Sequence, residues 1–401
     1  MTPRTGFTLA GVLAAAAALP LLAACGGGGG TMSTPPVQAM PAMPAGTTPA
    51  PVQMLDVRAT TAADRAQDER DRDDRGAVLP SLELKTIGST VDPLNGDQNP
   101  YGLDIAPVDA GLLHRGDLVV CNFNDAANVQ GNGTTLIALR PHSGATPVRI
   151  EQSTALGGCT ALALGPTDNI WSAAFVANDN PIVSPSGALL TTIPGGPWHH
   201  PFGQTFSAKD GPFGDGAFYE SNAGDGSIVR INLTAKGFTF DVIATGFAVN
   251  GGAPGGILGP SGLQYDEDRD ALDVIDGADN SVAVLRHVSR IPAHGVIVHG
   301  TTFGGPAAAF AHRIFAGPPL NGPISAALLP GGHLVIGNTL DPNGTNLMVE
   351  ITAGGRVVAT RNVDTGAAGA LFGMVANRRD RDDVRLYFND DNDNTVKLLS
   401  R

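Results

Sequence analysis

Short apolar runs separated by polar turns fill the chain from about residue 79 to its end. The runs are bounded by Gly, Asp and Asn, and none shows the 3.6-residue stripe of an amphipathic helix. Runs of this length and spacing are typical of short strands joined by tight turns. The pattern therefore predicts an all-β domain over 79–401.

One unit recurs along this domain. It consists of a Gly-containing apolar strand, a polar turn, a second strand that ends in Asn or Asp, a further turn and a third strand. Its six copies begin at positions 101, 159, 202, 261, 324 and 372, which are 43 to 63 residues apart. This period suits the four-stranded blades of a β-propeller. A seven-bladed ring and a β-sandwich are the structural alternatives.

The clearest copies are FGQTFSA…GAFYESNAGDGSIVRIN (202–232) and SGLQYDEDRDALDVIDGADNSVAVLRH (261–287). This pattern resembles the NHL repeats of six-bladed β-propellers over roughly 79–401, and the resemblance implies that fold. The chain ends at a third strand, Thr395–Ser400, which leaves the last blade one strand short. We expect the unassigned strand Leu82–Ile87 to fill the gap and close the ring without a bare edge. Long insertions at 142–157, 247–259 and 300–323 are expected to form loops.

The N-terminus carries an export signal. Arg4 precedes an apolar run from Phe7 to Ala24 that is too short and interrupted for a membrane span. Leu22-Ala23-Ala24-Cys25 resembles the lipobox of bacterial lipoproteins, which implies a signal peptide over 1–24 and acylation of Cys25. A plain signal peptide with an incidental Cys25 is the alternative. By the same resemblance, Gly26 rather than Asp after the cysteine implies the outer membrane, facing the periplasm or the cell surface.

A linker is expected over 25–78. Gly26–Gly30 is a flexible run, 31–55 is rich in Pro, Thr, Ala and Met, and 56–76 mixes charges densely. The charged part forms either disordered chain or a short solvated helix. We expect this lipid-anchored linker to hold the propeller away from the membrane.

Composition narrows the classes of protein. The chain has 53 glycines and 30 prolines, with 5% aromatic and 16% charged residues, which excludes a coiled coil or a helical bundle. An apolar fraction of 42% excludes a fully disordered chain. The net charge of −13 argues against nucleic acid as a partner, because the phosphates would be repelled.

Polar residues recur where the second strands end. These equivalent positions are Asn122, Ala174, Asn222, Asp276, Asn338 and Asp390. We call them the Asn/Asp ring and expect them near one mouth of the central channel. Such oxygens suit Ca²⁺, although Asn and Asp at strand ends also bond the turn backbone. Gluconolactonase-type lactonases and paraoxonases hold catalytic Ca²⁺ in such a channel, but their ligand set, in particular a Glu near the first strand, is not found here.

Other candidate residues lie outside the ring. The cluster Asn389–Asn394 is interpreted as a solvated turn or, alternatively, a Ca²⁺ loop that lacks the Gly and distal Glu of an EF-hand. Trp198, His199 and His200 precede an innermost strand, so they are candidates for ligand contact, metal binding or general acid–base chemistry at the channel mouth. A loop or packing role is the alternative. Cys121 and Cys159 form either a disulfide or two buried free thiols.

No nucleophile–base or metal-ligand constellation emerges from the sequence. We therefore expect a lipid-anchored β-propeller of the cell envelope that acts as a binding or scaffold module for a protein, peptide or glycan. The alternative is a metal-dependent, lactonase-like hydrolase or lyase in which Ca²⁺ on the Asn/Asp ring polarises the substrate and His199 or His200 moves the proton.

Overall fold

The computed structural model describes residues 76–193, 195–208, 216–234, 237–251, 256, 258–339, 346–377 and 383–401. The chain divides into two units, Met1–Ala59 and Thr60–Arg401, and every described residue belongs to the second. The expected signal peptide, Cys25 and most of the linker therefore lie outside the described residues. Within the described part, no helix is long and apolar enough to cross a membrane.

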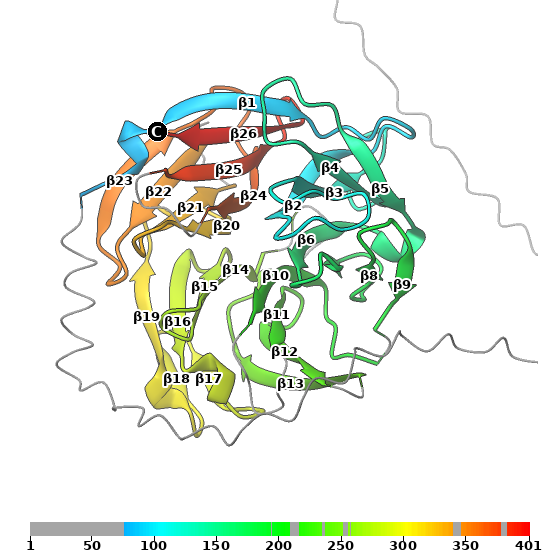
Figure 1. Cartoon of the computed structure of the whole chain (residues 1–401). Helices are drawn as coiled ribbons and strands as arrows, with labels where there is room; N and C mark the ends of the chain where they lie inside the picture. Colours follow the sequence, from blue (N-terminus) through cyan, green and yellow to red (C-terminus); the bar gives the residue numbers. More distant parts are fainter. Residues whose placement is uncertain are drawn as a thin grey trace, which may run out of the picture. The chain divides into compact units, whose positions relative to one another are not determined.

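Six β-sheets are arranged as the blades of a propeller, which confirms the predicted fold (Figure 1). From the innermost strand outward, blade 1 contains β2 (Gln98–Ile105), β3 (Leu118–Asn124), β4 (Thr135–Leu139) and β5 (Val148–Gln152). Blade 2 contains β6 (Cys159–Leu164), β7 (Ile170–Ala174), β8 (Ile182–Val183) and β9 (Leu189–Thr191). Blade 3 contains β10 (Pro201–Ser207), β11 (Ala217–Asn222), β12 (Ser227–Thr234), β13 (Gly237–Thr245), β17 (Val296–His299) and β18 (Thr302–Gly304).

The other three blades follow the same plan. Blade 4 contains β14 (Pro260–Asp266), β15 (Ala271–Asp276), β16 (Ser281–Arg286) and β19 (Ala311–Ala316). Blade 5 contains β20 (Pro323–Leu328), β21 (Leu334–Asn338), β22 (Leu347–Ile351) and β23 (Val357–Asn362). Blade 6 contains β24 (Leu371–Ala376), β25 (Arg385–Asp390), β26 (Thr395–Ser400) and, outermost, β1 (Glu83–Ser89).

Strands from both ends of the domain close the ring. β1 pairs antiparallel with β26, with Glu83 opposite Ser400 and Ser89 opposite Thr395. Figure 1 shows β1 (blue) beside β26 (red) in the same blade. The expected closure is therefore confirmed, and it removes the sheet edge that β26 would otherwise expose.

Two of the three expected loops contain strands. The insertion 142–157 holds β5 and the 3₁₀ turn η2 (Thr154–Leu156), and 300–323 holds most of β18, the turn η4 (Ala308–Phe310) and β19. These fourth strands lie at the outside of their blades, where one face is in water. Their side chains are accordingly half-exposed and mixed in polarity, so the apolar signal for a strand is weak.

The innermost strands approach one another closely around the channel. A Cβ atom at Gly203 would collide with the backbone oxygen of Ser261 on the next blade, and one at Gly373 would collide with that of Tyr101. Only glycine permits such an approach of two backbones. This close approach explains why glycine recurs in the first strand of the repeat.

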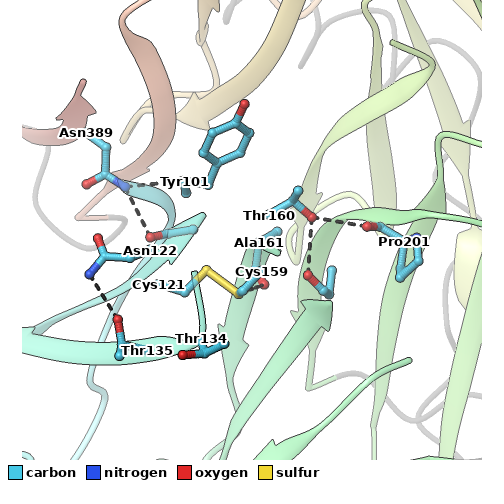
Figure 2. Close-up of a disulfide and its surroundings, with 12 residues drawn as sticks. Tyr101, Cys121, Asn122, Thr134, Thr135, Cys159, Thr160, Ala161, Pro201 and Asn389 are labelled. Carbon is cyan, nitrogen blue, oxygen red and sulfur yellow. Dashed lines mark hydrogen bonds between the residues drawn. A yellow bond between two sulfur atoms is a disulfide. The ribbon is translucent and has the colours of Figure 1, made fainter. Parts of the chain in front are cut away.

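A disulfide joins blades 1 and 2. Cys121 on β3 and Cys159 on β6 are bonded through sulfur, with their Cα atoms 6.0 Å apart (Figure 2). Both residues are fully buried among the apolar side chains between the two blades. Of the two alternatives open from the sequence, the structure contains the disulfide.

Candidate ligand-binding channel

The Asn/Asp ring lies where the innermost strands begin. Each ring residue is paired directly with a residue at the start of the neighbouring inner strand, the first residue in five blades and the third, Pro100, in blade 1. The pairs are Asn122 with Pro100, Ala174 with Cys159, Asn222 with Pro201, Asp276 with Pro260, Asn338 with Pro323 and Asp390 with Leu371. The structure therefore brings the predicted positions to one face of the propeller, which we call the entry mouth of the channel.

The ring side chains hold loops. The Asn222 Oδ1 accepts a bond of 3.0 Å from the His199 N–H, and its Nδ2 donates to the Pro197 carbonyl oxygen at 2.8 Å. Asn122 donates to the Thr90 carbonyl oxygen at 3.0 Å. The Asn338 Oδ1 accepts from the Asn321 N–H, and its Nδ2 donates to the Pro319 carbonyl oxygen. These contacts support the turn-bonding interpretation for Asn222 and Asn338, because their Oδ1 atoms, which a cation would need, already accept backbone N–H groups. The Asn122 Oδ1 is buried and has no partner in the described part of the protein.

Both carboxylate oxygens of Asp276 accept hydrogen bonds from backbone N–H groups. Its Oδ2 accepts from the Ala248 N–H and its Oδ1 from the Ala278 N–H, both at 2.9 Å. Burial, together with the charge of Asp279, raises the pKa of Asp276 to about 7 despite these bonds. Within the described ranges, no group of three or more His, Cys, Asp or Glu side chains is placed to hold a metal ion. A calcium site on the ring stays a prediction.

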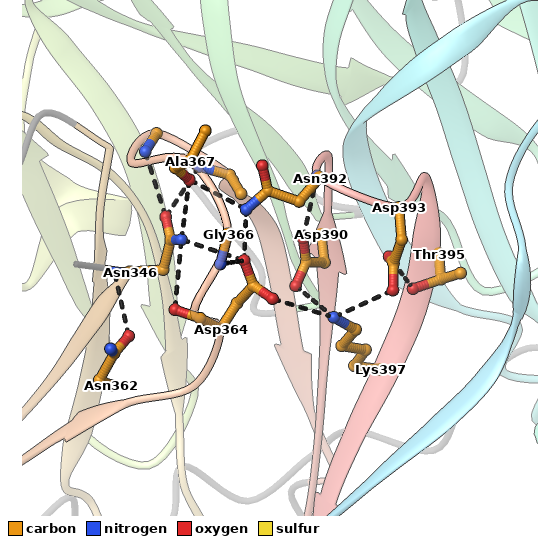
Figure 3. A network of polar contacts seen from close by, with 12 residues as sticks. Asn346, Asn362, Asp364, Gly366, Ala367, Asp390, Asn392, Asp393, Thr395 and Lys397 are labelled. Atoms are coloured by element: carbon orange, nitrogen blue, oxygen red, sulfur yellow. Dashed lines mark hydrogen bonds and ion pairs between the residues drawn. The ribbon is translucent and has the colours of Figure 1, made fainter. Parts of the chain in front are cut away.

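An ammonium group sits among the carboxylates at the end of β25. The Lys397 Nζ lies 2.6 Å from the Asp390 Oδ2, 3.2 Å from the Asp393 Oδ2 and 3.7 Å from the Asp364 Oδ1 (Figure 3). Asn389 points elsewhere and donates to the backbone oxygens of Tyr101 and Gly102. Asn389 and Asp390 are thus the buried last residues of β25, and residues 391–394 form the turn that leads to β26.

Trp198 does not face the channel. It is buried between blades 2 and 3, its Nε1 donates to the Ile193 carbonyl oxygen at 3.0 Å, and its ring meets Phe240 edge-on at 5.5 Å. A large aromatic side chain buries more apolar area between blades than at a wet mouth, which accounts for this position. The interpretation of Trp198 as a ligand-contacting residue at the mouth is therefore wrong.

The two histidines point in different directions. His199 is exposed, and its Nε2 lies 3.7 Å from the Asp225 Oδ2, a carboxylate that the sequence did not identify as a partner. His200 stacks on Phe175 with ring centroids 4.6 Å apart. Its backbone is left-handed, with φ of 54°, and its N–H donates to the Asn178 Oδ1 at 2.8 Å. Both histidines are exposed, His200 against the Phe175 ring and His199 beside Asp225, and a role of either in binding or proton transfer stays a prediction.

Aromatic side chains fill the entry mouth. Tyr101 stacks on Phe372 with centroids 4.0 Å apart and on Phe123 at 4.3 Å. Phe175 and Phe202 complete this cluster, which we call the aromatic plug. All five residues are buried, so this end of the channel is packed with side chains.

The opposite mouth, where the innermost strands end, is hollow. A cavity of about 500 Å³ lies there, and Arg115 and Glu267 are exposed on its rim. A smaller cavity of about 60 Å³ lies deeper in the channel and touches the aromatic plug at Tyr101 and Phe202. The large cavity falls in the range of natural small-molecule sites. We call this end the exit mouth.

One level of the channel separates the exit mouth from the plug. Equivalent residues of the six inner strands form it, and we call it the collar. Its members are Leu103, Leu162, Gln204, Leu263, Ala326 and Met374. All six line the small cavity, and Leu103, Leu162, Gln204 and Met374 also line the large one. Gln204 is the one polar side chain in this collar.

Gln204 is unusual in its bonding. Its side chain is buried, with 7% of the residue exposed, and neither Nε2 nor Oε1 has a hydrogen-bond partner in the described part of the protein. Buried amides normally form hydrogen bonds, because a buried donor or acceptor without a partner loses its hydration with no compensating interaction. The Gln204 amide lies on the wall of two cavities, and both its hydrogen-bond donor and its acceptor are unpaired. It therefore marks the position where a ligand or bound water would make contact.

Two more buried polar residues lie behind Gln204. Glu220 on β11 is directly opposite Gln204 in the strand register, so the two side chains project from the same face of blade 3. The Asn180 Nδ2 donates to the Glu220 Oε2. Burial raises the pKa of Glu220 well above its usual range, which holds the carboxyl toward its neutral form. Hence the wall behind Gln204 is polar and carries little charge.

The sequence contained a signal for this site. When the copies are aligned on the ring, Glu220 falls where the other second strands have Val120, Ser172, Val274, Ile336 and Phe388. A carboxylate at a position occupied by apolar or small residues is an exception to the repeat. An alignment of the strand ends alone does not reveal it, because Gln204 and Glu220 lie within their strands.

Comparison with known proteins supports the fold alone. No protein-family model matches the chain, and no curated protein matches it in sequence. An auxiliary nutrient-binding protein of Bacteroides thetaiotaomicron has a similar structure, with a TM-score of 0.50, 11% identity and coverage of 79% of this chain and 76% of that one. Virginiamycin B lyase of Staphylococcus aureus, in an inactive form with quinupristin, has a TM-score of 0.47, 15% identity and coverage of 80% and 99%. A putative gluconolactonase has a TM-score of 0.47, 11% identity and coverage of 80% and 92%.

The architecture and these neighbours define the class. The chain is a six-bladed β-propeller protein. A likeness of this kind shows the fold alone, and one fold serves both binding proteins and enzymes.

Proposed function

We propose that this protein is a ligand-binding β-propeller of the bacterial cell envelope, with its site in the channel at the exit mouth. The observation that carries the proposal is the cavity of about 500 Å³ lined by a buried amide without partners at Gln204. Its ligand is a small molecule or the end of a peptide or glycan chain. The rigid ring supplies a preformed wall, so that little ordering is needed on binding.

The proposal includes the location of the protein in the cell. Cys25 carries the lipid, residues 25–78 form the linker, and the propeller is held at the outer membrane. Two or more acyl chains on one residue suffice for stable anchoring, whereas one does not. Replacing Cys25 with Ser should move the protein from the membrane to the soluble envelope fraction, and mass spectrometry of the N-terminal peptide should show the acyl mass only in the wild type. We also propose that the blades are related to NHL repeats.

A channel-filling variant tests the binding function. Met374→Trp puts a larger side chain at a collar position that lines both cavities. Ligands would be sought by ligand-observed NMR of the full chain with envelope sugars, peptides and their fragments. A ligand of the proposed site should bind Met374→Trp at least tenfold more weakly, and the unfolding temperature of the variant would show that it is folded. Leu190→Ala, on the exposed outer strand β9, is the control and should bind as the wild type does. Equal binding to folded Met374→Trp and the wild type would contradict the proposed site.

The second candidate is a metal-dependent hydrolase or lyase. It is favoured by the convergence of Asn and Asp at the entry mouth, where Ca²⁺ would polarise a substrate carbonyl. Its test is the metal content of protein purified without chelator. About one tightly held Ca²⁺ per chain, lost in Asp276→Ala, would favour this function and justify a lactone and ester screen. An unfolding temperature that ignores both Ca²⁺ and chelator would argue against it.

A further inference from the structure

The collar is apolar except at one position. Leu103, Leu162 and Met374 line the same two cavities as Gln204, so a group bound at Gln204 would have aliphatic side chains around it. No side chain within the described ranges forms a hydrogen bond with the Gln204 amide, whose Nε2 and Oε1 both lack partners. Gln264 lines both cavities as well, but its Oε1 accepts from the Leu328 N–H, and the Ser325 hydroxyl lies on the wall of the small cavity. Gln204 is therefore the collar amide whose donor and acceptor are both available to a ligand.

The geometry of an amide restricts its partner. A carboxamide presents one acceptor and one donor side by side in a plane. Full satisfaction requires a planar group with one donor and one acceptor on the same edge. A carboxylate offers acceptors only, an ammonium group offers donors only, and a trans peptide bond has its N–H and C=O on opposite sides. None of these three can pair with Gln204 at both atoms.

The surroundings also disfavour a charged group. Glu220 projects from the same face of blade 3 as Gln204, and its own partner is the neutral side chain of Asn180. Its carboxyl is held toward the neutral form by burial. Of the charged residues that line the large cavity, Arg115 and Glu267 are exposed at the rim, while Asp104 is half-buried and accepts from the backbone N–H groups of Ile105 and Leu164. An anion at the depth of the collar would lose its hydration and meet no cationic side chain among the described residues that line it, and a cation would meet a Glu220 carboxyl that burial holds toward its neutral form.

We propose that the channel recognises a neutral cis-amide edge, in which an N–H and a C=O lie side by side, through paired hydrogen bonds to Gln204. A primary carboxamide, a lactam and the edge of a pyrimidine share this chemistry. The inference rests on the proposed ligand-binding function and names its substrate class. The Leu and Met side chains of the collar then pack on the faces of the bound group.

Matched small probes test the pairing. The full-length protein would be titrated by ligand-observed NMR with 2-pyrrolidinone, uracil and propionamide. N-methyl-2-pyrrolidinone and 1,3-dimethyluracil have almost the same shapes but no N–H donor. At least one N–H probe should bind tenfold or more tightly than its methylated partner. Equal binding within each pair would overturn the proposal, since it would mean that shape or a bridging water governs the site.

Variants at Gln204 identify the contact. Gln204→Leu restores the residue type of the collar, and Gln204→Met is a less branched replacement should Leu fail to fold. Either should abolish the preference for N–H probes while the unfolding temperature stays equal or rises, because an orphaned buried amide is removed. Gln98→Leu, at the opposite face on β2, is the control and should retain the preference. A preference that survives Gln204→Leu would overturn the assignment.

The outcomes separate the two proposals. Binding of other small molecules, weakened by Met374→Trp but without N–H selectivity, would overturn the cis-amide class and leave the channel site standing. Binding that is unchanged in both Met374→Trp and Gln204→Leu would remove the channel site itself.

Discussion

The carboxylate of Glu350 accepts a hydrogen bond of 2.8 Å from the backbone N–H of Leu79, which lies 271 residues earlier in the chain. The same carboxylate accepts from the Val78 N–H at 3.0 Å and lies 2.7 Å from the His333 Nδ1. On the other side, the Arg361 guanidinium donates to the Leu79 carbonyl oxygen at 3.1 Å. These buried contacts fix the turn η1 (Leu79–Ser81), which leads into β1, against blade 5.

Replacing Glu350 with Gln should lower the free energy of unfolding by about 2–3 kcal/mol, because charge-assisted bonds to a buried carboxylate are lost. Urea denaturation would measure the loss. Glu83→Gln on β1 is the control, since this exposed carboxylate contacts only the exposed Lys85, at 3.5 Å. It should change stability by less than about 0.5 kcal/mol. Similar losses in both variants would contradict the importance of the η1 contact.

Lys397→Met should destabilise the protein by about 3–5 kcal/mol at pH 7, because three carboxylates would remain without their shared cation. The loss should shrink at pH 5, since burial already raises the pKa of Asp390 and removal of the ammonium raises it further. Lys85→Met is the exposed control. A loss that does not depend on pH would mean that packing of the lysine stem, rather than charge, holds this turn.

Stability should depend on pH through Asp276. Its pKa is raised from 3.8 to about 7 in the folded protein, so the folded state binds the proton more tightly than the unfolded chain does. This contribution is fully present below about pH 4 and is lost as the pH rises through 7. The stability advantage of the wild type over Asp276→Asn should therefore decline between pH 4 and 7, by at most about 1.4 kcal/mol per pH unit. A constant difference would contradict the raised pKa.

The disulfide between Cys121 and Cys159 closes a loop with a sequence separation of 38 residues. The loop-entropy model assigns such a loop about 4 kcal/mol. The double variant Cys121→Ala/Cys159→Ala should unfold at a correspondingly lower urea concentration and should show no further change with reductant. A wild type whose unfolding is unaffected by complete reduction would contradict this contribution.

The sequence predicted the blades because a propeller repeats its burial pattern. A ring residue lies at or near the end of each second strand, and five of the six are Asn or Asp. Trp198 was misplaced because sequence proximity to an inner strand does not tell which way a side chain turns. Gln204 and Glu220 were missed for a different reason: each departs from the repeat at a single blade. Cross-strand register, which the repeat alone leaves open, brings the two together.

The order of contacts at the N-terminal end has a mechanical consequence. A pull on the chain before Gly76 would reach η1 and its contacts with Glu350 and Arg361 before it reached β1. Beyond them, β1 is held along its length by antiparallel pairing with β26. Tension along that strand would load its backbone hydrogen bonds together in shear rather than one at a time. An external force on the N-terminal side would therefore enter the ring first at blade 5, through η1, and only then load the pairing of β1 with β26 that closes the propeller.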